Sequence, residues 1–247
     1  MPGVGAPEPL EIAILRKVYH GSDGRTIEAV RDLRLAVAPH SFVALIGPSG
    51  CGKTTILRIL LGLDPDFEGS IRPKVEELAA AIVFQEPRLL PWRSVEDNVR
   101  LALRSAGRQA APLDGLFADL GLAEWRGRYP GELSLGMARR AALARALALD
   151  PDLLVLDEPF VSLDERAASE LRALVCRIVT RRRATVIMVT HNLREALELA
   201  DRLVFLSPRP ARVVADMTLT RAREARTDDW VEAQRRDLAS RVATLVE

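Results

Sequence analysis

The sequence lacks the features of a membrane-spanning or disulfide-stabilised protein. Its only cysteines, Cys51 and Cys176, lie far apart and have no metal-ligand spacing. We therefore expect two reduced thiols rather than a disulfide framework or a zinc site. No uninterrupted apolar run approaches the ~18–20 residues that a bilayer-crossing helix needs. Residues 1–9 have neither a basic start nor an apolar core, so we expect a flexible lead-in rather than a signal peptide, and a soluble, cytoplasmic chain.

A strong excess of charge is also missing. The 35 Lys and Arg residues nearly balance the 34 Asp and Glu residues, which leaves a formal net charge of +1. That balance provides no overall field for nucleic acid or an acidic membrane. The arginines at 181–183 are interpreted as a solvated loop between a helix and a strand, and we expect no nucleic-acid partner. The length of 247 residues suits one large α/β domain or a core with an inserted subdomain.

Short apolar runs alternate with helical patterns along most of the chain. Strands are expected at residues 10–18, 30–37, 42–46, 153–156 and 185–189, with a turn at 21–24. Helices are expected at residues 55–63, 113–122, 138–149, about 171–179 and 192–200, and a charged helical tail after about residue 216. Residues 94–97 resemble a capping box with Asp in place of Glu. Strands that alternate with helices indicate a parallel sheet covered on both faces.

A glycine-rich motif separates the apolar run 42–46 from the helix that follows it. Glycines let consecutive N–H groups surround a β-phosphate, and the helix presents its positive N-terminus to the same anion. Lys53 supplies a cation to the β- and γ-phosphates, and the Thr54 hydroxyl can bind Mg²⁺. The sequence therefore predicts a nucleoside triphosphate site. The motif G-x-x-x-x-G-K-[ST] is matched in full by Gly47, Pro48, Ser49, Gly50, Cys51, Gly52, Lys53 and Thr54, and Thr55 is included in the expected site.

Cys51 lies inside this motif. We interpret it as a small side chain that fills a tight loop. The alternative is a redox-sensitive thiol whose pKa is lowered at a helix N-terminus.

Two carboxylates follow a second apolar run. Residues 153–156 are all aliphatic, so the strand is buried and Asp157 emerges at its carboxyl end, where α/β sheets bind ligands. Asp157 is expected to hold Mg²⁺ through water. Glu158 can activate the attacking water as a general base. These acids predict an ATPase rather than a protein that only binds nucleotide.

With both motifs in place, residues 10–215 resemble the ATP-binding-cassette (ABC) ATPase family. Gln85 resembles the glutamine of the Q-loop, which contacts Mg²⁺ and links the site to membrane subunits. The segment ending in Asp164 resembles the D-loop. His191 resembles the switch histidine that contacts the γ-phosphate, and Tyr19 occupies the place of the aromatic residue that stacks on adenine. Taken alone, the histidine is more often structural and the tyrosine more often part of a core, but the ordered set carries the resemblance.

The family's signature motif is altered in this chain. The usual Leu-Ser-Gly-Gly-Gln appears at residues 133–137 with Leu135 in place of a glycine and Met137 in place of a polar residue. Ser134 can still cap the helix and donate to a γ-phosphate, and Gly136 still permits close approach of the backbone. If Leu135 had to adopt positive φ, the strain would cost about 1–3 kcal/mol. We expect the ATP-bound dimer to form nevertheless.

The resemblance implies an α/β fold with a P-loop NTPase core, a mainly parallel sheet, an N-terminal antiparallel β part and an inserted α-helical subdomain. It implies one ABC ATPase domain over 1–247, with its core at 10–86 and 151–215, its helical subdomain at 87–150 and its tail at 216–247. ATP and Mg²⁺ are the implied cofactors, and Lys53, Gln85, Glu158 and His191 the implied catalytic residues.

The implied partners are a second copy across the nucleotide sites, transmembrane permease subunits and a solute-binding protein, at the cytoplasmic face of the inner membrane. Residues 86–92 resemble the Q-loop extension of importers of nitrate, sulfonate and taurine, which implies a surface that receives a coupling helix of the permease. The alternative for residues 89–92 is an apolar strap that packs within the helical subdomain, and the two accounts are compatible. Arg139, Arg140 and Arg145 are interpreted as stabilising their helix. An exporter or lipid-transport ATPase is the alternative, and a soluble ATPase of DNA repair or translation a weaker one.

Overall fold

The computed structural model describes residues 8–21, 24–74, 77–108 and 111–246. The expected lead-in at 1–7 and the middle of the expected turn, 22–23, lie outside the described residues. The chain divides into two compact units, the first formed by Met1–Leu78 with Ile187–Glu247 and the second by Ala79–Val186. Among the described residues, no helix is both long enough and apolar enough to cross a bilayer.

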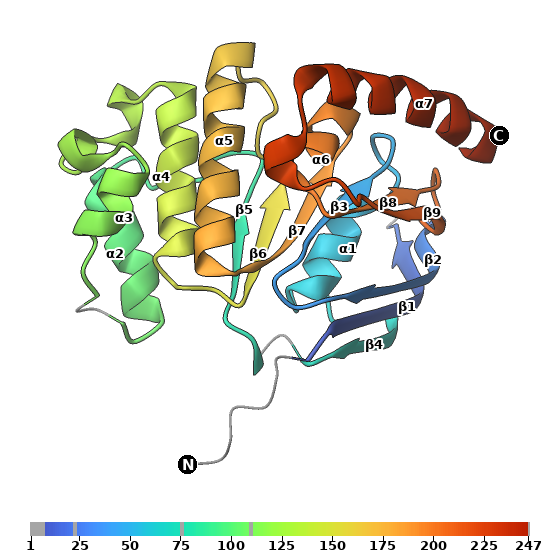
Figure 1. Ribbon diagram of the computed structural model, residues 1–247. Coiled ribbons are helices and arrows are strands. Elements are labelled where there is room, and N and C mark those ends of the chain that lie inside the picture. The colour runs from blue at the N-terminus through green and yellow to red at the C-terminus, as the bar shows by residue number, and fades with distance from the viewer. Residues whose placement is uncertain (1–7, 22–23, 75–76, 109–110, 247) are drawn as a thin grey trace. The chain divides into compact units, whose positions relative to one another are not determined.

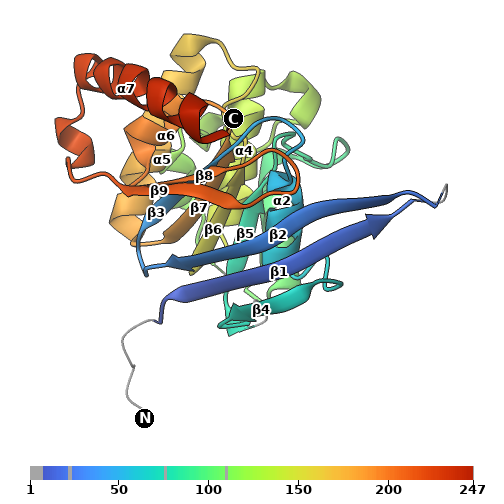
Figure 2. The same cartoon turned by 90° about the vertical axis from the view of Figure 1, so that its right-hand side faces the viewer.

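The first unit contains a three-stranded antiparallel sheet near the N-terminus. Its order is β2-β1-β4, with β1 at Leu10–His20, β2 at Thr26–Val37 and β4 at Glu68–Arg72 (Figure 2). Buried and exposed residues alternate along the first part of β1, as expected for a half-buried strand. Strand β4 was not predicted, because it is an exposed edge strand with one aliphatic side chain.

A second set of strands in the first unit has the order β7-β3-β8-β9. Strand β3, Phe42–Ile46, is buried throughout and pairs in parallel with β8, Arg202–Leu206. Strand β7, Thr185–Thr190, carries the chain into this unit from the second. Strand β9, Val213–Thr218, runs antiparallel to β8, so the helix of the expected tail begins later than residue 216, at Asp228.

The helices of the first unit are α1, Lys53–Leu60, α6, Leu193–Leu199, and α7, Asp228–Val246, with a 3₁₀ turn at Arg223–Ala225. Helix α6 packs against β3 and α7, and α7 against β9 (Figure 1). Helix α1 begins two residues earlier than expected and ends at Leu60 rather than residue 63. It ends there because Gly62, at φ 67°, leaves the helical region.

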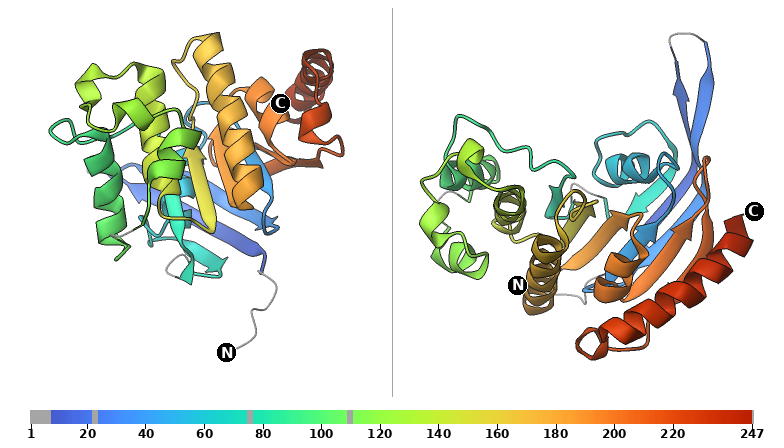
Figure 3. Two further views of the ribbon diagram at one scale, coloured as in Figure 1. Left: turned by 60° about the vertical axis from the view of Figure 1, so that its left-hand side comes forward. Right: turned by 90° about the horizontal axis from the view of Figure 1, so that it is seen from above.

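The second unit combines a parallel strand pair with helices. Strands β5, Ala80–Val83, and β6, Leu153–Asp157, pair from Ala80 opposite Leu153. Helix α4, Leu135–Leu147, packs against α2, α3, α5 and β5. In Figure 3 the green segment of α2 to α4 forms a helical cluster. The other helices are α2, Val95–Ser105, α3, Asp114–Asp119, and α5, Glu165–Arg182, with 3₁₀ turns at Ala123–Trp125 and Pro130–Glu132.

The helix ends in this unit confirm one expectation and correct another. Ser94 caps α2, since its hydroxyl oxygen accepts from the Asp97 N–H at 3.1 Å. The hydroxyl in turn donates to the Asp97 carboxylate at 2.8 Å. Arg181 and Arg182 belong to α5 rather than to a solvated loop, and Arg183 ends the helix with a left-handed backbone. The Arg182 guanidinium donates to the carbonyl of Leu147 at 2.9 Å.

Together the two units contain the antiparallel N-terminal strands, the mainly parallel strands and the helices of the predicted α/β class, which is confirmed.

Candidate active site

The glycine-rich loop lies between β3 and α1 in the first unit. Strand β3 ends at Ile46, and the first residue of α1 is Lys53. The Lys53 side chain is buried, and its Nζ donates to the carbonyl oxygens of Gly47 at 2.7 Å and Pro48 at 2.9 Å. The ammonium group is thus folded over the loop, while Thr54 is exposed at the start of the helix.

Two glycines of this loop have no room for a side chain. A Cβ on Gly47 would lie 2.9 Å from Sγ of Cys51 and 3.1 Å from Cβ of Leu206. Gly52 has φ 126°, and a Cβ there would lie 2.8 Å from the carbonyl oxygen of Ala29. The loop therefore requires glycine at position 52, and at position 47 a side chain would displace Cys51. Cys51 is buried beside Gly47, as expected of a side chain that fills a tight loop.

Helix α1 begins without a side-chain cap. Its N-cap residue is Gly52, which has no side chain to accept from the first N–H groups. The N-terminal N–H groups of a helix carry partial positive charge and bind anions. The start of α1 is therefore suited to a phosphate group.

Tyr19 lies on β1 beside the start of α1. Its hydroxyl donates to the Asp64 carboxylate at 2.8 Å and lies 3.4 Å from Oγ1 of Thr55. The ammonium of Lys17 donates to the other oxygen of Asp64 at 2.7 Å and lies 4.7 Å from the centroid of the Tyr19 ring. Tyr19 and Thr55, both predicted site residues, thus meet directly, and Lys17 and Asp64 hold Tyr19 in place.

Lys17 and Asp64 shift each other's protonation. Burial alone raises the pKa of Asp64, but the hydrogen bonds from Lys17 and Tyr19 and the lysine charge outweigh it, so the pKa is lowered. Burial alone lowers the pKa of Lys17, but the hydrogen bond and charge of Asp64 outweigh it, so the pKa is raised. The sequence predicted no role for Lys17 or Asp64. The one feature that could have indicated the pair is a lysine within a mainly apolar strand.

His191 directly follows β7 in the first unit and is exposed. Hydrogen bonds fix the turn that carries it. The Thr190 hydroxyl donates to Glu195 at 2.7 Å, and the Asn192 side chain donates to the same carboxylate at 3.1 Å. Asn192 also caps α6 by accepting from the N–H of Arg194.

The two acids lie at the end of β6 in the second unit. Four buried residues precede Asp157, the last residue of the strand, and both acids are half-buried. Glu158 has φ 44°, in the left-handed region. Such a backbone typically costs about 1–3 kcal/mol for a residue other than glycine and occurs often at functional sites.

The signature segment and the D-loop lead into α4 and α5 of the same unit. Ser134 caps α4 and accepts from the Met137 N–H at 3.3 Å, while Asp164 caps α5 and accepts from the Ala167 N–H at 2.9 Å. Leu135 is the first residue of α4, is 42% exposed and is not in the positive-φ region. The strain considered for Leu135 does not arise. A Cβ on Gly136 would meet only Cβ of Ala167, at 3.7 Å.

Arginines of α4 hold the segment that carries Gln85. Gln85 itself is exposed after β5. Arg139 donates to the carbonyl of Phe84 at 3.5 Å and to that of Val161 at 3.0 Å, and burial lowers its pKa. Arg145 donates to the carbonyls of Pro87 at 2.9 Å and Arg88 at 2.6 Å. The guanidinium groups of Arg139 and Arg145 therefore hold the backbone on both sides of Gln85 in addition to belonging to α4.

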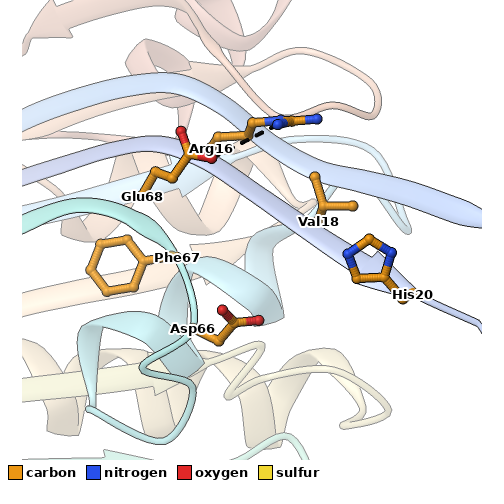
Figure 4. Close-up of a pocket in the computed structure, with 6 residues that line it drawn as sticks. All are labelled: Arg16, Val18, His20, Asp66, Phe67 and Glu68. Atoms are coloured by element: carbon orange, nitrogen blue, oxygen red, sulfur yellow. Dashed lines mark ion pairs between the residues drawn. The ribbon is translucent and has the colours of Figure 1, made fainter.

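A surface pocket of about 250 Å³ lies elsewhere in the first unit, beside β1 and β4 (Figure 4). Arg16 and Glu68 form an ion pair of 3.8 Å on one side of it. None of the predicted site residues lines this pocket. Its lining residues are Arg16, Val18, His20, Asp66, Phe67 and Glu68.

The predicted site residues fall into two sets, one in each unit. Among the described residues, no group of three or more His, Cys, Asp or Glu side chains is arranged to hold a metal ion. The first unit holds Tyr19, the loop 47–54, Thr55 and His191, and the second holds Gln85, Ser134, Gly136, Asp157, Glu158 and Asp164.

Comparison with known proteins gives consistent results. A family model described as "ABC transporter" matches residues 30–161, which is more than half of the chain. A second, described as "AAA domain, putative AbiEii toxin, Type IV TA system", matches residues 126–198.

Among curated proteins, the aliphatic sulfonates import ATP-binding protein SsuB 2 of Burkholderia cenocepacia is 44% identical over 236 residues, covering 93% of this chain and 86% of that protein. The taurine import ATP-binding protein TauB of Rhizobium johnstonii is 41% identical over 206 residues, covering 79% of this chain and 78% of that protein.

Solved structures agree on the fold. A dimeric bacterial ABC transporter cassette has a TM-score of 0.73 at 26% identity, covering 86% of this chain and 100% of that chain. A dimeric ATP-binding cassette in a post-hydrolysis state, bound to ADP and Pi, has a TM-score of 0.71 with the same coverage. Its identity is 24%, so that likeness concerns the fold alone.

Proposed function

The chain belongs to the ABC transporter ATPase family, and from this premise we propose that it is the ATP-hydrolysing subunit of an importer of sulfonate- or taurine-like solutes. The observation that carries the proposal is the complete phosphate-binding loop. A side chain at Gly47 or Gly52 would displace neighbouring atoms, the Lys53 ammonium hydrogen-bonds to the carbonyls of the loop, and a helix without a side-chain cap follows. The named relatives supply the direction of transport and the class of solute.

In this proposal the first unit binds ATP. The backbone N–H groups of residues 47 and 49–54 surround the β-phosphate, and Lys53 exchanges its carbonyl partners for phosphate oxygens. Tyr19 stacks on the adenine ring. An aromatic face is suited to that role because stacking needs no particular hydrogen-bond pattern.

The second unit supplies the hydrolytic residues. Glu158 takes a proton from the attacking water as general base, a role typically worth about 10²–10⁴ in rate. Thr54, Gln85 and Asp157 offer the hydroxyl, amide and carboxylate oxygens that Mg²⁺ prefers, with phosphates and water completing its shell. Bound there, Mg²⁺ would neutralise charge on the β- and γ-phosphates. His191 contacts the γ-phosphate.

Two copies are needed for a complete site. Ser134 and Gly136 of one copy, with Asp164 of its D-loop, close the nucleotide site of the other in an isologous two-fold arrangement. The exposure of Ser134 and the room beside Gly136, where a Cβ would meet only Cβ of Ala167 at 3.7 Å, support this assignment.

Permease subunits are the proposed membrane partners, joined by a solute-binding protein. The segment after Gln85 carries Trp92, whose side chain is 71% exposed, and an exposed aromatic beside a switch loop suits a docking surface. The chain would then lie at the cytoplasmic face of the inner membrane as a peripheral subunit. We propose residues 87–150 as the helical subdomain within the single ATPase domain over 1–247.

Co-purification from membranes and ATPase assays test the proposal together. A multi-span permease and a solute-binding protein should co-purify with the chain, and magnesium should be required for ATP cleavage. Recovery of ribosomes or DNA instead would end the transport assignment.

The variant Glu158→Gln separates binding from chemistry. It should retain ATP binding and accumulate an ATP-bound dimer on size-exclusion chromatography, while hydrolysis falls by about 10²–10⁴ because the general base is lost. Glu124→Gln, an exposed carboxylate of the same unit, is the matched control and should match wild type. Full hydrolysis by a strictly monomeric protein would contradict the dimer.

A further inference from the structure

The connection between β8 and β9 lies directly against the phosphate-binding loop. At the start of that loop, a Cβ on Gly47 would lie 3.1 Å from Cβ of Leu206, the last residue of β8. At its end, a Cβ on Gly52 would lie 3.2 Å from Cβ of Ala211. Both ends of the phosphate-binding loop are therefore packed on one hairpin.

The middle of the phosphate-binding loop is held by an arginine of this hairpin. The Arg209 guanidinium donates to the carbonyl oxygen of Gly50 through Nε at 3.1 Å and through Nη2 at 2.7 Å, although 159 residues separate the two. A planar guanidinium with two adjacent donors restricts an acceptor more than a single flexible ammonium would. Gly50 has no side chain of its own that could fix the loop there.

The hairpin is itself firmly held. The Ser207 hydroxyl donates to the carbonyl of Pro210 at 2.8 Å, and its oxygen accepts from the N–H of Arg212 at 3.0 Å. The N–H of Ala211 donates to the carbonyl of Ala29 on β2 at 2.9 Å. Arg209 is therefore presented from an ordered turn that is joined to a neighbouring sheet.

Holding the Gly50 carbonyl also orients an anion-binding group. This carbonyl and the N–H of Cys51 belong to one planar trans peptide, so they point in opposite directions. The Cys51 N–H donates to the Pro48 carbonyl at 3.3 Å, a long bond that a phosphate oxygen can replace. Ordering a loop costs conformational entropy at every residue, so a loop that is already ordered binds its anion more tightly.

We propose that Arg209 is a positioning residue that keeps the phosphate-binding loop in its anion-binding form, with the β8–β9 hairpin as its support. This inference rests on the proposed function, because it assumes that residues 47–54 bind the phosphates of ATP. Arg209 acts through the Gly50 peptide rather than by touching the nucleotide.

Equilibrium titration with ATP and with inorganic tripolyphosphate tests the inference. Arg209→Ala should raise both dissociation constants by about five- to tenfold, since two charge-assisted hydrogen bonds are lost. The KM for ATP should rise similarly, with kcat at saturating ATP within about twofold and the melting temperature of the nucleotide-free chain within about 2 °C. Arg209→Lys should recover part of the affinity, because it keeps the charge but not the paired donors.

The matched control is Arg212→Ala, an exposed arginine of the same hairpin, which should bind both ligands as wild type does. Wild-type affinity in Arg209→Ala, or equal losses in Arg209→Ala and Arg212→Ala, would overturn the inference. A lower melting temperature without weaker binding would show a purely structural role and would also overturn it. Lys53→Ala tests the proposed function separately. If Lys53→Ala binds ATP as tightly as wild type, the proposed function fails. If Lys53→Ala binds ATP weakly but Arg209→Ala binds it as tightly as wild type, only the inference about Arg209 fails.

Discussion

The phosphate-binding loop and the signature segment both lead into the N-terminus of a helix, but they prepare that terminus differently. Gly52 leaves the first N–H groups of α1 without a side-chain cap. Ser134 caps α4 with its own hydroxyl, through a bond of 3.3 Å to the Met137 N–H. One terminus is open to an external anion, whereas the other is partly satisfied within the chain.

The two segments also differ in how much substitution they allow. Side chains cannot be added at Gly47 or Gly52 without displacing neighbours, whereas Gly136 meets only one methyl group at an ordinary distance and Leu135 is exposed. The comparison indicates that the fold of one chain dictates the sequence of the phosphate-binding loop. The chain alone places weaker demands on the signature segment, which is consistent with a segment whose contacts are completed by a second copy.

The largest effect that would test this comparison is expected from paired alanine substitutions. Gly52→Ala should weaken ATP binding by the purified chain by about 100-fold, because strain at φ 126° and the 2.8 Å approach to the Ala29 carbonyl distort the loop. Gly136→Ala should leave ATP binding unchanged, raise the melting temperature slightly because alanine replaces a helical glycine, and reduce only hydrolysis by the dimer. Calorimetric titration and thermal unfolding of both variants provide the measurement. Equal losses of ATP binding would break the comparison.

A smaller effect is expected at Asp64, which holds Tyr19 beside the start of α1. Asp64→Asn should lower the free energy of unfolding by about 3 kcal/mol, because the buried ammonium of Lys17 loses its main partner. It should weaken binding of ATP but not of tripolyphosphate, since Tyr19 faces the base in our proposal. Asp66→Asn is the matched control: its 91% exposed carboxylate lies 3.5 Å from the same ammonium, and its loss should change little because an exposed ion pair contributes little to stability. Equal losses for both ligands would contradict the role of Tyr19.

The same pair predicts a pH window. Because the pKa of Asp64 is lowered, its contribution to stability is complete above the ordinary carboxyl value of 3.8 and is lost as pH falls below it. Because the pKa of Lys17 is raised, its contribution is complete below 10.5 and is lost as pH rises above that value. Wild type minus Asp64→Asn should therefore show a constant difference in unfolding free energy between these limits and a decline outside them. A difference that peaks near pH 7 and falls on both sides would contradict the assignment.

The parts of the site that could be predicted from sequence are those that a short segment specifies. The run Phe42–Ile46 and the loop after it follow from local composition, and so does the run that ends in Asp157. Strand β4 and the hairpin of Arg209 depend on partners far along the chain, so composition gave no indication of either. The left-handed backbone of Glu158 was equally hidden, since no residue pattern marks a non-glycine residue at positive φ.

The smallest effect is expected at Leu135 of the signature segment. The leucine occupies a helical first position without strain, so Leu135→Gly relieves nothing and should cost at most about 1 kcal/mol of helix stability. ATP binding by the chain should be unchanged and hydrolysis by the complete transporter within about threefold of wild type, with Leu135→Ala as control. A rise in hydrolysis of more than about tenfold in Leu135→Gly would show that the leucine obstructs formation of the dimer. A fall of similar size would show that its exposed side chain packs on the second copy, and the signature segment would then be as constrained as the phosphate-binding loop, only by a partner rather than by its own fold.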